Sequence, residues 1–320
     1  MEKGPVECSI VIPVMNEQDN IRPLYDEIVK VLAEEDITYE IIFVDDGSTD
    51  ETFDRIKELA EVDSGVNGLS FSRNFGHQMA LTAGMDYAKG DCVITMDGDL
   101  QHPPSLIPEM LKRWREGNEI VYTVRKNGEK LGLVKRLGTR IFYFLITKFS
   151  GMKMKPNTPD FRLFDRRVVE VFRNLPERAR YIRGLTFWVG FKKAEIPFFA
   201  AARHSGDVKY SFGKMLGLAI SAITSFSRFP LQLSFYFGLS VAFISFIYAI
   251  YAIWQKIFNN NIVPGWTSIL ISVLFLGGVQ LITAGILGEY IAQIYDEVKA
   301  RPLYILREKA GKSLTTNPDE

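Results

Sequence analysis

The stretch "CVITMDGDLQHPP", residues 92–104, places two carboxylates directly after an apolar run. The run "CVITM" has the length of a buried β-strand, and Asp97 and Asp99 follow it with only Gly98 between them. Continuous apolar runs of this length are typical of strands in a sheet that is covered on both faces. The stretch therefore predicts a buried strand that ends in an acidic turn.

Strand and helix patterns alternate on either side of this stretch. The runs "CSIVIPV", "YEIIFVDD" and the weaker "GLSFSRN" precede it and have strand length. Helical patterns such as "DETFDRIKELAEV" separate these runs. Alternation of this kind predicts an α/β domain with a mostly parallel, doubly wound sheet.

Polar residues follow three of the predicted strands, as Asn16–Glu17, Asp45–Asp46 and Asp97–Asp99. In doubly wound sheets, ligands bind beyond the carboxyl ends of the strands. The chain has neither a GxGxxG nor a P-loop lysine motif, which argues against a redox dinucleotide or a P-loop ATP site. Carboxylates at the end of a stiff strand instead favour Mg²⁺ or Mn²⁺, which keep phosphate oxygens and waters in their shells. A solvated turn without any ligand is the alternative interpretation.

Composition excludes several classes of protein. The 320 residues contain 38 basic and 38 acidic side chains, so the sequence carries no electrostatic footprint for nucleic acid. Cys8 and Cys92 both lie in apolar runs, which fits a reduced compartment better than a disulfide framework or a zinc cluster. The sequence reaches its first apolar strand without a signal-peptide pattern.

Two uncharged stretches, residues 229–255 and 257–288, are long enough for membrane-spanning helices, which need about 20 apolar residues. Buried core helices are the alternative. Lysines and arginines precede the first stretch and follow the second, whereas the connecting loop carries only Lys256. This charge distribution predicts a multi-pass protein of the cytoplasmic (inner) membrane, with the α/β domain and both termini in the cytoplasm.

The segment "YSFGKMLGLAISAITSFSRF" has apolar residues at helical spacing and few charges. It predicts an interfacial helix on the membrane surface, and a third buried helix is the alternative. We therefore expect an α/β domain over 1–205, a juxtamembrane amphipathic segment over 206–228, two transmembrane helices over 229–294 and a cytoplasmic tail over 295–320.

Five motifs occur in order along the chain: "SIVIPVMNEQDN", "VDDGSTDET", "SRNFGHQMALTAGMDYAKGD", "DGDLQHPP" and "PDFRLFDRR". Together they resemble the GT-A glycosyltransferases of family 2. Within that family the chain looks like the polyprenyl-phosphate glycosyltransferases, the group of dolichol-phosphate mannose synthase and bactoprenol glucosyltransferase. The resemblance continues through "GEYIAQIYDEVKARPLY" after the second apolar stretch, so it covers nearly the whole chain.

The resemblance implies a GT-A domain that transfers a hexose from a nucleoside diphosphate to a polyprenyl phosphate, with a divalent metal and inversion at the anomeric carbon. UDP-glucose and undecaprenyl phosphate are the expected substrates, and a β-linked lipid phosphosugar is the expected product. UDP-N-acetylglucosamine, a UDP-4-amino-arabinose derivative and GDP-mannose are alternative donors. A non-catalytic membrane scaffold is the alternative class. Relatives also imply a homo-oligomer, with a tetramer suspected.

The resemblance also implies roles for individual residues. The nucleotide would contact Pro13, Glu17, Asp46 and Asp97. The metal would be held by Asp97, Asp99 and Gln101. Catalytic roles fall to Asp160, Arg125 and Arg203, and the acceptor phosphate would meet Arg125, Lys135, Thr139 and Lys209. Asp160 matches a catalytic base, but a phosphate monoester has a second pKa of about 6 and hardly needs one. We therefore expect Asp160 to orient the acceptor or a nearby arginine at least as much as to take a proton.

Overall fold

The structure is a computed structural model that describes residues 6–126, 155, 157–178, 180–199, 229–259 and 265–311. It divides into two compact units. The first comprises Met1–Tyr143, Met152–Lys209 and Arg301–Glu320, and the second comprises Phe144–Gly151 and Tyr210–Ala300. Each unit is described by itself below.

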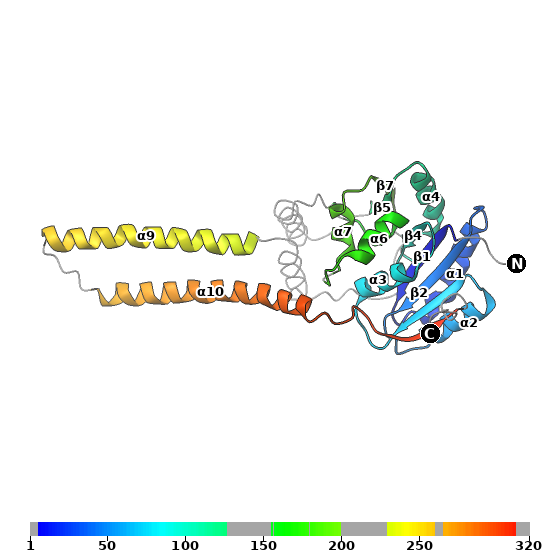
Figure 1. The fold of residues 1–320 in the computed structure, drawn as a ribbon, viewed down its shortest axis with the longest axis horizontal. Coiled ribbons are helices and arrows are strands. Elements are labelled where there is room, and N and C mark those ends of the chain that lie inside the picture. Colours follow the sequence, from blue (N-terminus) through cyan, green and yellow to red (C-terminus); the bar gives the residue numbers. More distant parts are fainter. Residues whose placement is uncertain are drawn as a thin grey trace. The chain divides into compact units, whose positions relative to one another are not determined.

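The first unit is built on an eight-stranded sheet with the order β7-β5-β6-β4-β1-β2-β3-β8. Figure 1 shows part of this sheet, with β1, β2, β4, β5 and β7 labelled. Its strands are β1 (Cys8–Val14), β2 (Tyr39–Asp45), β3 (Val66–Phe71), β4 (Cys92–Thr95), β5 (Ile120–Arg125), β6 (Arg162–Asp165), β7 (Lys193–Phe198) and β8 (Leu306–Ala310). Only β6 and β8 run antiparallel to their neighbours. The mostly parallel sheet confirms the predicted fold class.

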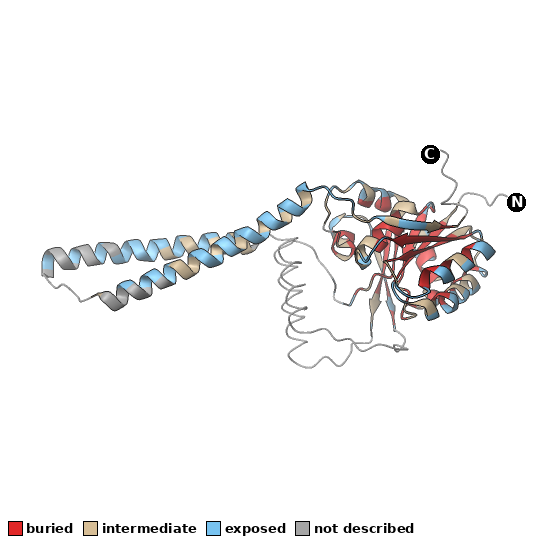
Figure 2. Ribbon diagram, turned by 90° about the horizontal axis from the view of Figure 1, so that it is seen from below, coloured by how far each residue is buried: buried red, intermediate tan, exposed pale blue. Residues whose placement is uncertain are grey.

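Helices cover both faces of this sheet. They are α1 (Gln18–Leu32), α2 (Thr52–Val62), α3 (His77–Tyr87), η1 (Pro104–Leu106), α4 (Ile107–Arg115), α6 (Arg166–Asn174) and α7 (Ile182–Trp188). In β1, Ile10 and Ile12 pack with residues of α1, α2 and α4, whereas Val11 packs with residues of α3, α6 and α7. Successive strand residues face opposite sides, so a strand buried on both faces must be apolar throughout. Figure 2 shows the resulting buried layer along the sheet.

The last described residues return to this domain after the two long helices. Strand β8 pairs antiparallel with β3, so that Ala310 lies opposite Gly68 and Leu306 opposite Phe71. Just before β8, the ring of Tyr304 stacks on Phe71 at a centroid distance of 5.2 Å. The tail predicted over 295–320 thus contributes an edge strand to the α/β domain, which the predicted boundary at 205 did not include.

The second unit contains the helices α9 (Phe229–Asn259) and α10 (Trp266–Val298), 31 and 33 residues long. By length and composition, the stretches Pro230–Tyr248 and Phe275–Val298 suffice to cross a membrane. Their apolar side chains are exposed, for example Phe235 at 65%. The two long apolar helices were predicted, but the expected interfacial segment at 206–228 lies outside the described residues.

Candidate active site

The acidic turn after β4 is tightly packed against β1. A Cβ atom on Gly98 would lie 2.6 Å from Val14 Cγ1 and 3.3 Å from the Pro13 carbonyl oxygen, so only glycine fits there. Leu100 has a φ of 60°, a left-handed conformation that costs free energy in residues other than glycine. Packing and backbone strain therefore fix the positions of Asp97 and Asp99.

The turn contains buried polar atoms whose hydrogen-bonding capacity is unused within the described part of the chain. Among the described residues, neither Asp97 Oδ1 nor Gln101 Nε2 has a hydrogen-bond partner, and both atoms are buried. Asp99 Oδ1 accepts a hydrogen bond from the Gln101 backbone N–H at 3.1 Å. No cluster of three or more His, Cys, Asp or Glu side chains suitable for a metal occurs among the described residues. Hard carboxylate oxygens at a water-accessible edge fit Mg²⁺ or Mn²⁺ when phosphate oxygens and waters complete the shell.

Asp160 lies at the same edge because β6 pairs with β4. The register places Thr95, the last residue of β4, opposite Arg162, the first residue of β6. The Thr95 hydroxyl donates a hydrogen bond to the Asp160 carbonyl oxygen at 2.7 Å. The side chain of Asp160 is only 1% exposed. A buried carboxylate needs compensating charge.

Arg183 of α7 supplies part of that compensation, together with His77 and Arg162. Its Nε lies 3.0 Å from both carboxylate oxygens of Asp160, and its Nη2 lies 2.9 Å from Oδ2. Burial acts to raise the pKa of Asp160, but His77, Arg183 and Arg162 outweigh it and hold this pKa well below its usual range. Asp160 is therefore an ionised carboxylate across the physiological pH range. The sequence prediction did not include Arg183.

His77, the first residue of α3, connects the two acidic groups. Its Nε2 lies 3.4 Å from Asp97 Oδ1 and 3.4 Å from Asp160 Oδ2. Burial acts to lower the pKa of His77, and the two carboxylates reverse the direction and raise it. His77 thus joins the acidic turn to the buried Asp160–Arg183 pair.

His102 has a structural role in the same turn. Its Nδ1 accepts the Asp97 backbone N–H at 2.9 Å, and its ring stacks on Phe161 at a centroid distance of 5.1 Å. Burial lowers the pKa of His102, so the ring is neutral and Nδ1 remains an acceptor. The third histidine, His204, lies outside the described residues.

The acidic pair after β2 is bonded within the protein. Asp46 accepts hydrogen bonds from the backbone N–H groups of Phe75 and Gly76, at 2.7 and 2.9 Å. Burial raises the pKa of Asp46, and these two hydrogen bonds oppose the rise. Asp45 accepts from the Ser48 N–H at 3.0 Å and from the Ser70 hydroxyl at 2.8 Å. Both side chains stabilise the loops around the edge, and a nucleoside contact of Asp46 stays a prediction.

The remaining predicted residues divide into described and undescribed positions. Pro13 is buried within β1, and Glu17 follows that strand. Burial raises the pKa of Glu17, Asn20 opposes the rise, and the charge of Asp99 adds to it. Glu17 therefore lies within the electrostatic reach of the acidic turn. The predicted residues Lys135, Thr139, Arg203 and Lys209 lie outside the described residues.

Arg125 ends β5 on the same edge of the sheet. Its backbone N–H donates to the carbonyl of Asn157 at 2.9 Å. Its side-chain Nε is buried and has no hydrogen-bond partner among the described residues. A phosphate contact of Arg125 stays a prediction.

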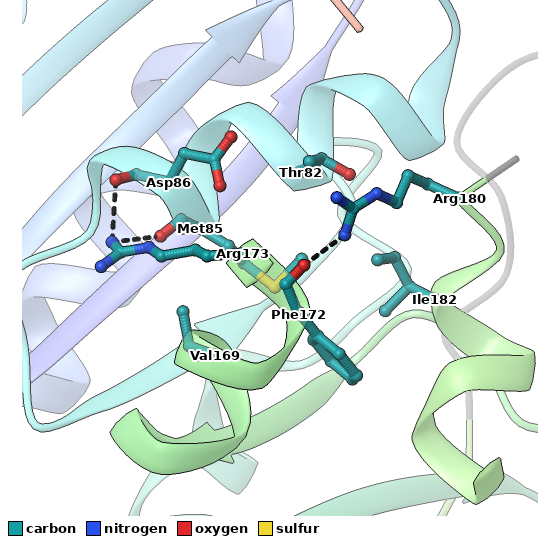
Figure 3. A pocket seen from close by; sticks show the side chains of 8 residues that line it. All are labelled: Thr82, Met85, Asp86, Val169, Phe172, Arg173, Arg180 and Ile182. Atoms are coloured by element: carbon teal, nitrogen blue, oxygen red, sulfur yellow. Dashed lines mark hydrogen bonds between the residues drawn. The ribbon is translucent and has the colours of Figure 1, made fainter. Parts of the chain in front are cut away.

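A second group of basic side chains lies at the other end of α3 and is structural. Arg173 donates to the carbonyl oxygens of Met85 and Asp86 at 2.7 and 2.8 Å, and Arg180 donates to that of Phe172 (Figure 3). These carbonyls belong to the last turns of α3 and α6, which lack intrahelical partners. The two arginines therefore cap helices and fill a small hollow beside them.

Two family models match separate parts of the chain. Residues 9–172 match the model of "Glycosyl transferase family 2", and residues 229–294 match that of the "GtrB C-terminal hairpin". The second match has the same bounds as the predicted pair of transmembrane helices.

Three similar proteins extend over almost the whole chain. The "Bactoprenol glucosyl transferase" of Shigella phage SfII is 43% identical over 303 residues, covering 95% of this chain and 98% of its own length. A "Prophage bactoprenol glucosyl transferase homolog" of Escherichia coli is 42% identical over 303 residues, covering 94% and 99%. An uncharacterised glycosyltransferase of Synechocystis is 42% identical over 306 residues, covering 96% of each chain. The chain therefore belongs to glycosyltransferase family 2 and is a glycosyltransferase.

Solved structures share the fold. Glucosyl-3-phosphoglycerate synthase of Mycobacterium tuberculosis, in complex with Mn²⁺, UDP and phosphoglyceric acid, gives a TM-score of 0.51 at 21% identity, covering 69% of this chain and 78% of its own. The same enzyme in complex with Mg²⁺ and UDP gives 0.50 at 20% identity, covering 70% and 80%. At this identity the likeness establishes the GT-A-like α/β fold alone.

Proposed function

We propose that this glycosyltransferase moves a hexose, glucose from UDP-glucose, to undecaprenyl phosphate at the cytoplasmic membrane face. The observation that carries the proposal is the meeting of Asp97, Asp99 and Asp160 at one edge of the sheet, in a chain that also has the two long apolar helices. The relatives named bactoprenol glucosyl transferase support the acceptor and the sugar. The fold neighbour with UDP and Mn²⁺ or Mg²⁺ supports the donor class and the metal.

In the proposed reaction, a phosphate oxygen of the acceptor attacks the anomeric carbon from the face opposite the diphosphate. The bond from that carbon to the diphosphate breaks, and its electron pair leaves with UDP. Asp97, Asp99 and Gln101 would hold Mg²⁺ or Mn²⁺, which when bound neutralises charge on the leaving diphosphate. Inversion would give a β-linked polyprenyl-phosphate sugar.

The other predicted residues would bind and orient the two substrates. Pro13, Glu17 and Asp46 would border the nucleoside. Basic side chains suit the approach of two anionic substrates, because arginine donates planar, charge-assisted hydrogen bonds to phosphate. In this proposal they are Arg125, Arg203, Lys135 and Lys209, together with the hydroxyl of Thr139.

Asp160 would act by orienting rather than by taking a proton. The acceptor phosphate is mostly a dianion at neutral pH, because its second pKa is about 6. Asp160 is buried and ionised, with both oxygens engaged by Arg183. Such a carboxylate has little reason to gain a proton during transfer.

The membrane hairpin would deliver the lipid acceptor. A polyprenol partitions into the bilayer while its phosphate stays at the surface, so a membrane-anchored domain meets it there. The distribution of lysine and arginine around the two helices supports a topology with both termini in the cytoplasm. Assembly into a homo-oligomer, with four chains suspected, is part of the same proposal.

Radiolabel transfer tests this proposal directly. The full chain in detergent would receive Mg²⁺, undecaprenyl phosphate and, in separate tubes, labelled UDP-glucose, UDP-N-acetylglucosamine, a UDP-4-amino-arabinose derivative or GDP-mannose. We expect label to enter the organic phase from UDP-glucose, and to be lost with EDTA or Asp99→Ala. Transfer from another donor would correct the sugar. No transfer from any donor by a folded protein would favour a non-catalytic membrane scaffold.

A further inference from the structure

Arg183 combines a fixed guanidinium with an open side. Its side chain is 40% exposed, whereas its partner Asp160 is 1% exposed. Asp160 engages Nε and Nη2 of the guanidinium. Within the described parts of the chain, Nη1 has no hydrogen-bond partner. Since arginine has five N–H donors, the fork retains donors for a further acceptor.

Neighbouring contacts fix the helix that carries Arg183. Gln78 Oε1 accepts the Ile182 backbone N–H at 2.8 Å, and Gln78 Nε2 donates to Asp160 Oδ2 at 3.3 Å. Gln78 therefore ties the first residue of α7 to the same carboxylate that holds Arg183. Arg162, fully buried in β6, donates to the Thr186 hydroxyl one turn further along α7. Both contacts determine where the guanidinium lies before any substrate binds.

Arg183 lies near the acidic turn, to which the proposed function assigns the donor and its metal. His77 Nε2 lies 3.4 Å from Asp160 and 3.4 Å from Asp97, so Arg183 is separated from the acidic turn by one carboxylate and one imidazole. Three carboxylates, Asp97, Asp99 and Asp160, gather at this edge. The guanidinium of Arg183 is already oriented beside these carboxylates. It therefore suits a doubly charged oxyanion, because the side chain needs little reorganisation when the anion binds.

From this geometry we infer that Arg183 binds a phosphate group of one of the two substrates, and that Asp160 is the residue that positions it. The inference rests on the proposed function, which supplies two phosphate-bearing substrates. The acceptor's phosphomonoester and the donor's diphosphate share the recognising chemistry, a planar fork of charge-assisted donors. Asp160 then acts through Arg183 instead of contacting the reacting atoms.

Arg183 could instead have a purely structural role, as the counter-ion that allows Asp160 to be buried. In that case its substitution would leave the binding of both phosphate ligands unchanged. A lysine at position 183 would keep the positive charge but lose the planar fork. Arg183→Lys therefore separates the two roles, and Arg183→Gln removes the charge as well. Arg113→Lys is a matched control, because Arg113 is 45% exposed and pairs with Glu109 at 2.8 Å, on a helix without residues of the acidic edge.

The test measures binding to the full chain in detergent by calorimetry. One arm uses UDP with Mg²⁺, and the other uses farnesyl phosphate, with farnesol as the phosphate-free comparison. We expect Arg183→Lys to weaken binding of one phosphate ligand by about tenfold or more, with farnesol and the Arg113→Lys control unchanged. A change with farnesyl phosphate assigns Arg183 to the acceptor, and a change with UDP assigns it to the donor.

Asp160→Asn examines the positioning role. We expect it to weaken the same ligand as Arg183→Lys, and the double variant to be little worse than either single one, because both changes remove one interaction. If the Arg183 variants fail to fold, the binding measurements on Asp160→Asn still test the inference. Thermal unfolding of each variant checks the fold.

Unchanged binding of both phosphate ligands in a folded Arg183→Lys protein would overturn the inference, even if turnover fell. Additive losses in the double variant would overturn the positioning role of Asp160. Failure of the wild-type protein to transfer sugar from any donor would refute the proposed function separately, since the binding arms still report whether Arg183 contacts phosphate.

Discussion

Two acidic pairs lie at the same edge of the sheet, on the strands that flank β1, and they differ in their bonding. Asp45 and Asp46 are 2% and 4% exposed, and both carboxylates accept hydrogen bonds from neighbouring loops. In the pair after β4, Asp97 Oδ1 has no hydrogen-bond partner among the described residues, and Asp99 accepts one backbone N–H. The two oxygens of Asp97 have only longer contacts to histidine, at 3.4 and 3.5 Å. The position of a carboxylate at a strand end therefore does not identify a ligand. Carboxylate oxygens that make no hydrogen bond within the described residues, such as Asp97 Oδ1 with its 3.4 Å contact to His77 Nε2, are the better indicator.

The largest effect is expected from the incompletely bonded pair. Asp97→Asn and Asp99→Asn should each lower sugar transfer by about 10³-fold, because a bound metal contributes several kcal/mol of charge stabilisation. The thermal unfolding temperature in the absence of metal should change little, since Asp99 accepts one backbone hydrogen bond and the contacts of Asp97 with His77 and His102 are long, at 3.4 and 3.5 Å. Transfer assays and differential scanning fluorimetry measure both quantities. Wild-type rates in either variant would remove the metal role from this pair.

Asp160 is a further carboxylate of this edge, and both of its oxygens contact Arg183. Asp160→Asn should slow transfer by about tenfold to a hundredfold through loss of the contact that holds Arg183. The acidic limb of the pH–rate profile should stay at about pH 6, because it reports the second ionisation of the acceptor phosphate. The profile of kcat/KM from pH 5 to 9 tests this. If Asp160 were a general base, the limb would move or vanish in the variant.

Asp46→Asn should mainly affect stability. Asparagine offers one acceptor oxygen and an NH₂ group where the Phe75 and Gly76 N–H groups need acceptors, so a loss of about 1–3 kcal/mol is expected. Thermal unfolding measures the loss, and Asp26→Asn on the exposed face of α1 is the control. Binding of UDP should stay within a few-fold of wild type if Asp46 acts only on the loops. A much larger loss of UDP affinity in the folded variant would support the predicted nucleoside contact.

The sequence was sufficient to predict the features of the fold that depend on local patterns of residues. Strand periodicity and the position of Asp97 and Asp99 after an apolar run predicted the sheet and its acidic edge. The bonding of each carboxylate depends on residues far along the chain. Arg183 is 23 positions from Asp160, and Gly76 is 30 positions from Asp46. The only signal for Arg183 was indirect, since a buried aspartate requires a cation that any of 38 basic residues could supply.

Local sequence patterns likewise did not predict that the chain returns to the catalytic domain and adds β8 to its sheet. Strand β8 follows more than a hundred residues after the last strand of the α/β alternation, and its sequence "LREKA" has mixed polarity. Such an edge strand is stabilised by backbone pairing with β3 and needs no apolar run of its own. The polar tail therefore gave no sign that it would join the sheet.

The smallest effect is expected where this returning segment bonds to Asp86, a carboxylate near the C-terminal end of α3. The Tyr304 hydroxyl donates to Asp86 at 3.0 Å, and burial raises the pKa of Asp86 while this hydrogen bond opposes the rise. Tyr304→Phe keeps the stacking on Phe71 and removes the hydrogen bond. We expect a loss of about 1 kcal/mol at pH 7, or about 2–4 °C in Tm.

The pH dependence of that loss follows from the sign of the shift. A carboxyl group with a raised pKa in the folded state contributes stability below its unfolded pKa, of about 3.9, and loses that contribution as pH rises through the folded value. Tyr304→Phe raises the folded pKa of Asp86 further, so the variant's deficit should be largest at neutral pH and shrink toward pH 4. Paired unfolding curves of wild type and variant at both pH values measure it. A deficit that is independent of pH would mean that Tyr304 contributes through packing on Phe71 and not through the carboxylate.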